Sequence, residues 1–147
     1  MCLIIDVNVA HKILLMSDDP DFRDVHECLF TSKMPHARIA HGGKLTREYL
    51  HSHKIRRVLV ELDRAGRAWK VDDELVEREV EWVLESGLCE SDDEHIIGLA
   101  RVSHVRLLCS HDQALHIDFT NKALLDKPRG KVYQTRKHKR LLRKFCS

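Results

Sequence analysis

Short apolar runs alternate along the chain with longer stretches in which apolar residues recur at helical spacing. Residues 2–5 are apolar without alternation, which is typical of a strand buried on both faces, and a second short buried strand is predicted at 106–109. A further strand is predicted at 37–40 and an edge strand near Val132. Helices are predicted at 7–16, 21–31, 45–62, 72–85, 92–103 and 111–119. This alternation predicts an α/β fold, a three-layer α/β/α sandwich around a mostly parallel sheet.

Two of the predicted helices carry features that refine the prediction. The helix at 45–62 follows Gly42–Gly43 and contains a break near residues 51–53. The helix at 72–85 is strongly amphipathic, with acidic residues on one face and Gly87 as its stop. Its predicted buried face consists of Leu75, Val76, Val80, Val83 and Leu84.

Acidic residues stand where two of the predicted strands end. Asp6 follows residues 3–5 directly, and Asp112 follows 107–109 after a Ser-His step. In open parallel sheets, ligands bind outside the carboxyl ends of the strands, so neighbouring strands would bring these carboxylates together. Asp93 opens the helix that leads into the second strand and can reach the same rim. Acids that meet in this way repel one another unless a hard cation such as Mg²⁺ or Mn²⁺ neutralises them.

Helix capping is the alternative explanation for each of these acids. Asp is among the preferred residues at the first position of a helix, and Asp6, Asp93 and Asp112 all precede predicted helices. Asp92 competes with Asp93 for the role at the rim. Taken singly, each acid fits capping better than catalysis, and only the combination favours a metal site.

Three stretches together resemble the PIN domain family, the fold of VapC-like ribonucleases. They are LIIDVNVA at Leu3–Ala10, LTREYL at Leu45–Leu50, and DDEHIIGLA with LLCSHDQAL at Asp92–Ala100 and Leu107–Leu115. The resemblance covers most of residues 1–120 and implies a PIN-like nuclease domain at 1–126. The helix-rich segment between Glu48 and Asp72 and the C-terminal extension at 127–147 depart from the family pattern.

The resemblance also implies a site and a reaction. Asp6, Glu48, Asp93 and Asp112 would be the catalytic residues and the ligands of Mg²⁺ or Mn²⁺, with Asp93 preferred to Asp92 because Ile96 then falls in register. Asn8 and Ser110 would hold a ligand carboxylate or a metal-bound water. The implied activity is metal-dependent endoribonuclease cleavage of phosphodiester bonds in single-stranded RNA.

The charge of the chain is unevenly distributed. Residues 127–147 contain nine Lys or Arg and no acid, whereas the other 16 basic and 23 acidic residues give 1–126 a net charge of −7. Such a basic segment suggests a phosphate-bearing partner, although charge runs are as often simply solvated. We expect RNA to be attracted by Arg136, Lys137, Lys139, Arg140, Arg143 and Lys144.

Cysteines and apolar runs bear on the compartment. The five cysteines are odd in number and form no CxxC pair, so neither a disulfide framework nor a zinc ribbon is indicated. Cys2 and Cys109 are interpreted as small core hydrophobes, which together with the lack of a signal peptide or a membrane-spanning run predicts a reducing cytoplasm. His51 and His53 are interpreted as a surface pair. Asp118 is either a further acid near Asp112 or a solvated charge at a helix end.

Two other roles stay open at the level of sequence. The chain could be a non-catalytic nucleic-acid-binding or regulatory module that uses its basic segment. It could also be the toxin of a toxin–antitoxin pair, with an antitoxin protein covering the acidic groove, and PIN-like proteins often pair as homodimers. No P-loop, GxGxxG or GxSxG is present, so nucleotide-cofactor and serine-hydrolase functions have no support.

Overall fold

The computed structural model describes residues 2–147 as an alternation of strands and helices. The strands are β1 (Ile4–Ile5), β2 (Ile39–His41), β3 (Ala68–Lys70), β4 (Leu107–Cys109) and β5 (Lys131–Tyr133). The helices are α1 (Val7–Leu14), α2 (Arg23–Phe30), α3 (Gly43–Leu50), α4 (His53–Arg64), α5 (Asp73–Ser86), α6 (Glu94–Ser103), α7 (Gln113–Phe119), the 3₁₀ helix η1 (Arg136–His138) and α8 (Arg140–Cys146).

All strand pairs in the described residues are parallel. β1 pairs with β4 and β4 with β5, while β2 pairs with β3. A parallel bridge between Leu3 and Ile39 joins the two groups, and the Ala40 N–H donates to the Leu3 carbonyl oxygen at 2.9 Å. The strand order is therefore β3-β2-β1-β4-β5. Strands β2 and β3 are added on one side of β1, and β4 and β5 on the other. The carboxyl ends of β1 and β4 are therefore the topological switch point, where α/β proteins bind ligands.

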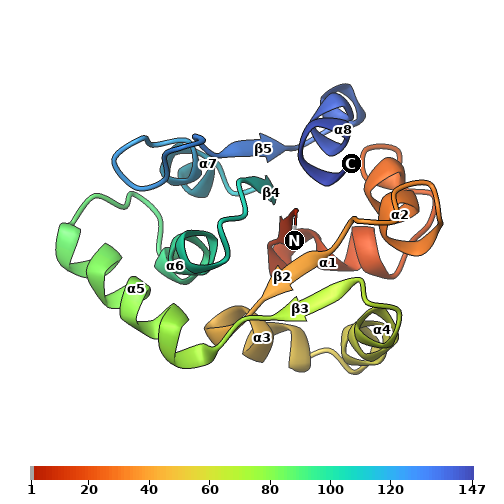
Figure 1. The fold of residues 1–147 in the computed structure, drawn as a ribbon, viewed down its shortest axis with the longest axis horizontal. Coiled ribbons are helices and arrows are strands. Elements are labelled where there is room, and N and C mark those ends of the chain that lie inside the picture. Colours follow the sequence, from red (N-terminus) through yellow and green to blue (C-terminus); the bar gives the residue numbers. More distant parts are fainter. Residues whose placement is uncertain (1) are drawn as a thin grey trace.

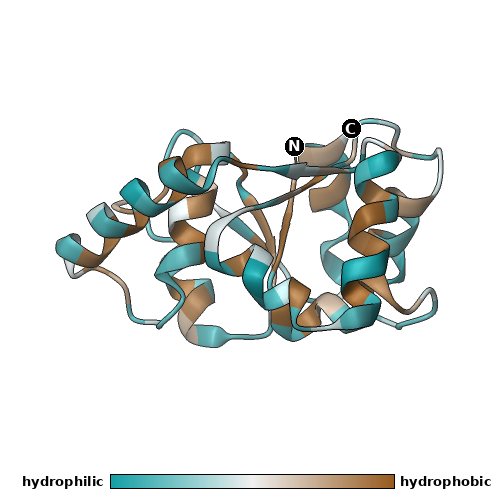
Figure 2. Ribbon diagram, turned by 90° about the horizontal axis from the view of Figure 1, so that it is seen from below, coloured by the Kyte–Doolittle hydropathy of each residue, from teal (hydrophilic) through white to brown (hydrophobic). Residues whose placement is uncertain are grey.

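Helices lie on both sides of the strands. In Figure 1, α2, α4 and α8 lie on one side of the central strands β1 and β4, and α6 and α7 lie on the other. The central strands are hydrophobic, and the helices carry hydrophobic and hydrophilic residues on different faces (Figure 2). Ile4, Ile5, Leu107 and Leu108 are fully buried, because helices cover both faces of the central strands. The predicted α/β class with parallel strands is confirmed.

Most predicted elements occur, and the differences have local causes. The predicted break near residue 52 is real: α3 ends at Leu50, and the Ser52 hydroxyl caps α4 by accepting a hydrogen bond from the Ile55 N–H at 3.3 Å. Strand β3 has no apolar run to predict it, since only Ala68 of its three residues is buried. Helix α8 was not predicted, because its many Lys and Arg residues mask the apolar spacing. Leu142 and Cys146, four residues apart, are both buried.

The predicted buried face of α5 is too wide. Val76 and Val83 are buried, but Leu75 and Leu84 remain 46% and 56% exposed. Helix α5 lies at the edge of the molecule beside α6 (Figure 1), so only one side of it is covered. That contact is close: a Cβ placed on Gly98 of α6 would come within 2.5 Å of Val80 Cγ2. Helix α5 therefore packs on α6 through a narrow contact and does not bury the broad apolar face that was predicted for it.

The prediction that the cysteines are all unbridged is wrong. Cys2 and Cys146 form a disulfide with their Cα atoms 5.0 Å apart, whereas Cys28 and Cys109 are free and buried. The two half-cystines are separated by 144 positions in the sequence, so no short spacing pattern links them. The disulfide removes the argument from free cysteines for a reducing compartment. As for the membrane, residues 2–147 contain no helix with the length and hydrophobicity needed to cross one.

Candidate acidic active site at the carboxyl ends of β1 and β4

Asp6 is the first residue after β1 and is almost fully buried. It is the N-cap residue, directly before α1, yet its side chain makes no capping hydrogen bond. Instead, Asp6 Oδ2 accepts a hydrogen bond from the Ser110 hydroxyl at 2.7 Å. Burial raises the pKa of Asp6, and the charge of Glu48 raises it further, against the lowering effect of the Ser110 hydrogen bond. This carboxylate is thus held for a role other than capping.

Asp93 lies beside the other acids, while Asp92 is exposed. Asp93 is the N-cap residue of α6, directly before the helix, and makes no side-chain capping bond. Burial raises the pKa of Asp93 to about 7, helped by a hydrogen bond with Asp112 and by the charges of Asp6, Asp112 and Glu48. The structure therefore gathers the four predicted acids into one electrostatic neighbourhood, with Asp93 and not Asp92 as its member.

Asp112 does what the capping alternative predicts. Its Oδ1 accepts a hydrogen bond from the Leu115 N–H at 3.2 Å at the start of α7. The Asp112 N–H in turn donates to the Ser110 hydroxyl oxygen at 3.1 Å. Ser110 therefore links the ends of β1 and β4, since the same hydroxyl donates to Asp6. Capping and site membership coexist at this one position.

Glu48 enters the site from α3 and is held by a histidine. His95 Nε2–H, on the first turn of α6, donates to Glu48 Oε1 at 2.9 Å. Burial lowers the pKa of His95, and the charge of Glu48 opposes that shift. His95 is itself buried, with only 5% of it exposed. Its position two residues after Asp93 was the signal available in the sequence.

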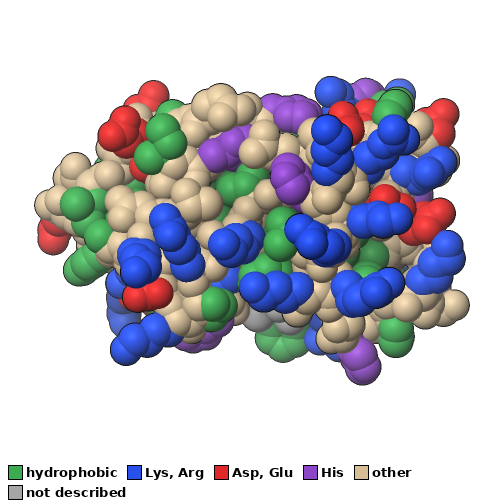
Figure 3. Space-filling model, turned by 90° about the horizontal axis from the view of Figure 1, so that it is seen from above, with side chains coloured by type: hydrophobic (Ala, Val, Ile, Leu, Met, Phe, Trp, Pro, Cys, Tyr) green, Lys and Arg blue, Asp and Glu red, His purple; other side chains and the backbone are tan. Residues whose placement is uncertain are grey.

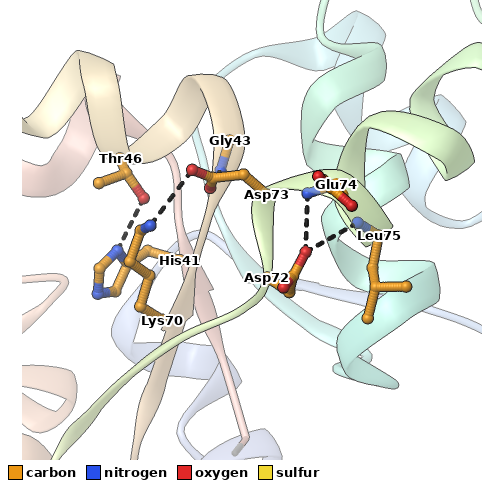
Figure 4. Close-up of polar contacts among 8 residues, drawn as sticks. All are labelled: His41, Gly43, Thr46, Lys70, Asp72, Asp73, Glu74 and Leu75. Atoms are coloured by element: carbon orange, nitrogen blue, oxygen red, sulfur yellow. Dashed lines mark hydrogen bonds and ion pairs between the residues drawn. The ribbon is translucent and has the colours of Figure 1, made fainter.

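The start of α3 is anchored by a polar network at the carboxyl ends of β2 and β3 (Figure 4). Asp73 Oδ1 accepts from the Gly43 N–H at 2.8 Å, and Asp73 Oδ2 accepts from Lys70 Nζ at 3.2 Å. Gly43 has a φ of +56° and lies against Val76, so a side chain there would be both strained and crowded. Tyr49, next to Glu48, donates its hydroxyl hydrogen to the Ile5 carbonyl oxygen. These contacts fix Glu48 near the end of β1.

The loop before Asp93 is held by Asp118, which is completely buried. Its carboxylate accepts hydrogen bonds from the Glu90 N–H at 2.8 Å, the Ser91 N–H at 2.9 Å and the Ser91 hydroxyl at 2.6 Å. The Asp93 N–H then donates to the Ser91 hydroxyl oxygen at 3.2 Å. Of the two alternatives for Asp118, the solvated charge is therefore excluded, and the donors, 27 and 28 residues away, compensate its burial.

The two residues predicted to support the acids differ in position. Ser110 is buried and contacts both Asp6 and Asp112, and its carbonyl oxygen accepts a 2.6 Å hydrogen bond from His116 Nε2–H. Asn8 is exposed on the first turn of α1. The structure therefore brings Ser110, but not Asn8, into contact with the acids.

The basic residues predicted to attract RNA lie on η1 and α8. Lys and Arg side chains spread over the face seen from the side of β5 and α8 (Figure 3). Four of them line a hollow of about 330 Å³ on α8, namely Lys139, Arg140, Arg143 and Lys144. Aromatic contacts link this region to the site: His111 packs on Phe22, Phe22 on Tyr133, and Tyr133 on His138 of η1.

The donor set fits a hard divalent cation in chemistry, because it consists of carboxylate oxygens. Among residues 2–147, however, no group of three or more His, Cys, Asp or Glu side chains is arranged to hold a metal ion. Each acid shares a hydrogen bond with a neighbouring residue instead, so a cation would have to draw the oxygens together. The repulsion that raises the pKa of Asp93 is the charge that such a cation would neutralise.

Relatives were sought at three levels. Comparison of the chain with family models, with curated proteins and with solved structures found no match. The site therefore has to be understood from its own geometry.

Proposed function

We propose that this chain is a PIN-like endoribonuclease that uses Mg²⁺ or Mn²⁺ to cleave phosphodiester bonds in single-stranded RNA. The observation that carries the proposal is the convergence of Asp6, Glu48, Asp93 and Asp112 at the switch point between β1 and β4. Two of these acids stand at helix starts without capping them. A structural role thus leaves their carboxylates unexplained, whereas a cation site explains them.

Each residue has a task in this proposal. Asp6, Asp93, Asp112 and Glu48 would hold the cation, which when bound supplies positive charge to the scissile phosphate and lowers the pKa of an attacking water. Ser110 keeps the Asp6 carboxylate turned toward the site, and His95 does the same for Glu48. The cations of η1 and α8 would attract the RNA backbone, which the acidic crevice alone would repel.

The PIN-like architecture belongs to the same proposal. It is supported by the parallel order β3-β2-β1-β4-β5, by helices on both sides of the strands and by acids at the carboxyl ends of the two central strands. An antitoxin partner and a homodimer remain predictions of the sequence.

The test is cleavage of a labelled single-stranded RNA by variants at two adjacent acids. Asp93→Asn should lower the rate by about 100-fold or more, since loss of a ligand should exceed the 10- to 100-fold cost typical of a supporting residue. Asp92→Asn removes the same charge from the exposed neighbour and should leave the rate unchanged. Activity should require Mg²⁺ or Mn²⁺ and stop in chelator.

Two results would count against the proposal. Equal cleavage by both variants would remove Asp93 from the site. RNA binding without any cleavage by the unmodified protein, in either metal, would favour the non-catalytic binding module instead.

A further inference from the structure

Helices α3 and α4 carry a second group of cations, separate from those of η1 and α8. Its members are exposed and follow one another along the chain: Lys44, His53, Lys54, Arg56, Arg57 and Arg64. Within residues 2–147, none of these side chains forms an ion pair, because the four ion pairs found there involve other cations. The group therefore presents a net positive charge that no ion pair engages.

Lys44 connects this group to the acidic site. It lies one helical turn before Glu48, so the two side chains share a face of α3. Lys44 thus stands at the rim of the crevice, on the α3 side.

Helix α4 continues the positive surface away from the crevice. His53, Arg56, Arg57 and Arg64 line a hollow of about 330 Å³, together with Val60 and Glu61. Arg is well suited to phosphate, because its planar guanidinium offers several N–H donors at once. A run of charge alone would be ordinary surface, but this one is concave, lacks ion pairs and begins beside the proposed site.

The two basic surfaces lie toward opposite edges of the sheet. Helix α4 packs beside β3, at one edge, and η1 follows β5, at the other edge. Parallel strands are about 4.8 Å apart, so the edges of a sheet in the order β3-β2-β1-β4-β5 are roughly 19 Å apart. Strands β1 and β4, whose ends carry the acids, lie between these two edges, and α3 begins at Gly43, two residues after the carboxyl end of β2. An extended polyanion that crosses this end of the sheet would meet cations on both sides of the acids.

We propose that Lys44 and the α4 hollow form a second phosphate-binding surface for single-stranded RNA, across the acidic crevice from the η1–α8 surface. This inference rests on the proposed function and specifies how the substrate lies: the strand is held on both sides of the phosphate that is cut. An RNA long enough to reach both surfaces binds more tightly than one that reaches a single surface.

The test measures binding in chelator, so that cleavage plays no part. Affinity for a fluorescent single-stranded RNA is compared between the unmodified protein and Arg56→Gln/Arg57→Gln across about 50–200 mM salt. The variant should bind about tenfold more weakly at the lower salt, and the slope of log affinity against log salt should fall by about 1.4 for two lost phosphate contacts. Lys44→Gln, on the neighbouring helix, should show a smaller loss of the same kind.

The matched control is Lys12→Gln/Arg78→Gln, which removes two exposed cations from α1 and α5. It should leave affinity and salt slope nearly unchanged. If Arg56→Gln/Arg57→Gln and Lys44→Gln behave like this control while retaining their thermal stability, α4 is not an RNA-binding surface, whatever the nuclease assay shows. Conversely, a selective loss of binding supports the surface even if the unmodified protein cleaves nothing.

Discussion

The carboxyl edge of the sheet carries acidic residues at two places, and their surroundings differ. At the ends of β2 and β3, Asp73 accepts hydrogen bonds from the Gly43 N–H and from Lys70 (Figure 4). The Gly43 hydrogen bond is the largest of the contributions that lower the pKa of Asp73. At the ends of β1 and β4, Asp6 and Asp93 face other carboxylates, and burial raises the pKa of both. An aspartate whose neighbours are N–H donors stabilises the fold. An aspartate whose neighbours include other carboxylates adds to a concentration of negative charge.

This contrast separates structural acids from functional ones without reference to relatives. Asp118 is more deeply buried than Asp93, yet three donors surround its carboxylate. Burial alone therefore does not mark a site. What marks it is burial together with like charge, because the fold gains nothing from that arrangement unless a cation is to be bound.

The largest expected difference is in the RNA-cleavage activity of variants at the two groups of acids. Asp6→Asn should lower the rate of RNA cleavage by about 100-fold or more, because it removes a proposed metal ligand. Asp73→Asn should lower it by less than about tenfold, since Asp73 acts only by holding the start of α3. Both rates are measured at saturating Mn²⁺. Similar losses in the two variants would erase the distinction between the two places.

A smaller effect is expected at Ser110, which supports Asp6 without being a ligand. Ser110→Ala removes the hydroxyl that donates to Asp6 Oδ2 and accepts from the Asp112 N–H, and should reduce cleavage by about 10- to 100-fold. The control is Ser103→Ala, whose hydroxyl donates to a carbonyl oxygen within α6. If cleavage by the Ser110 variant equals that by the control, the Ser110 contact has no functional role.

The smallest effects are in stability, and they should have opposite dependence on pH. The pKa of Asp93 is raised to about 7, so its ionisation destabilises the fold progressively from about pH 4 to pH 7. Asp93→Asn should therefore melt about 2–4 °C above the unmodified protein at pH 8 in chelator, with the gain vanishing below pH 4.

Asp73 provides the mirror image. Its pKa is lowered from 3.8, so the ionised form stabilises the fold above that value, and this contribution is lost as the pH falls through the folded-state pKa. Asp73→Asn should melt a few degrees below the unmodified protein at pH 7, and the deficit should shrink at acidic pH. Thermal melts across pH check both variants, and shifts of the same sign would contradict the assignment.

The sequence was most informative where function depends on local pattern. Asp6 and Asp112 follow apolar runs directly, so their meeting at one sheet edge could be predicted from strand order. Glu48 could be placed only through the resemblance to PIN domains, because nothing near it in the sequence points to β1. Its position depends on Gly43, Tyr49 and Asp73, which act through tertiary contacts.

The features that were missed depend on partners far apart in the chain. Asp118 holds a loop 27 and 28 residues before it, and Cys2 bonds to a cysteine 144 residues away. The His95 contact with Glu48 spans 47 residues. Helix α8 was also not predicted, because its sequence is dominated by basic residues, although Leu142 packs in the core. Local periodicity reports none of these pairings.

The most direct test of the central claim is anomalous diffraction from a crystal of this protein soaked in Mn²⁺. The account predicts a manganese peak between Asp6, Asp93 and Asp112, with their carboxylate oxygens drawn to about 2.2 Å from the metal and Glu48 beside it. An empty crevice in a crystal that binds Mn²⁺ elsewhere, for example at His51 and His53, would contradict it.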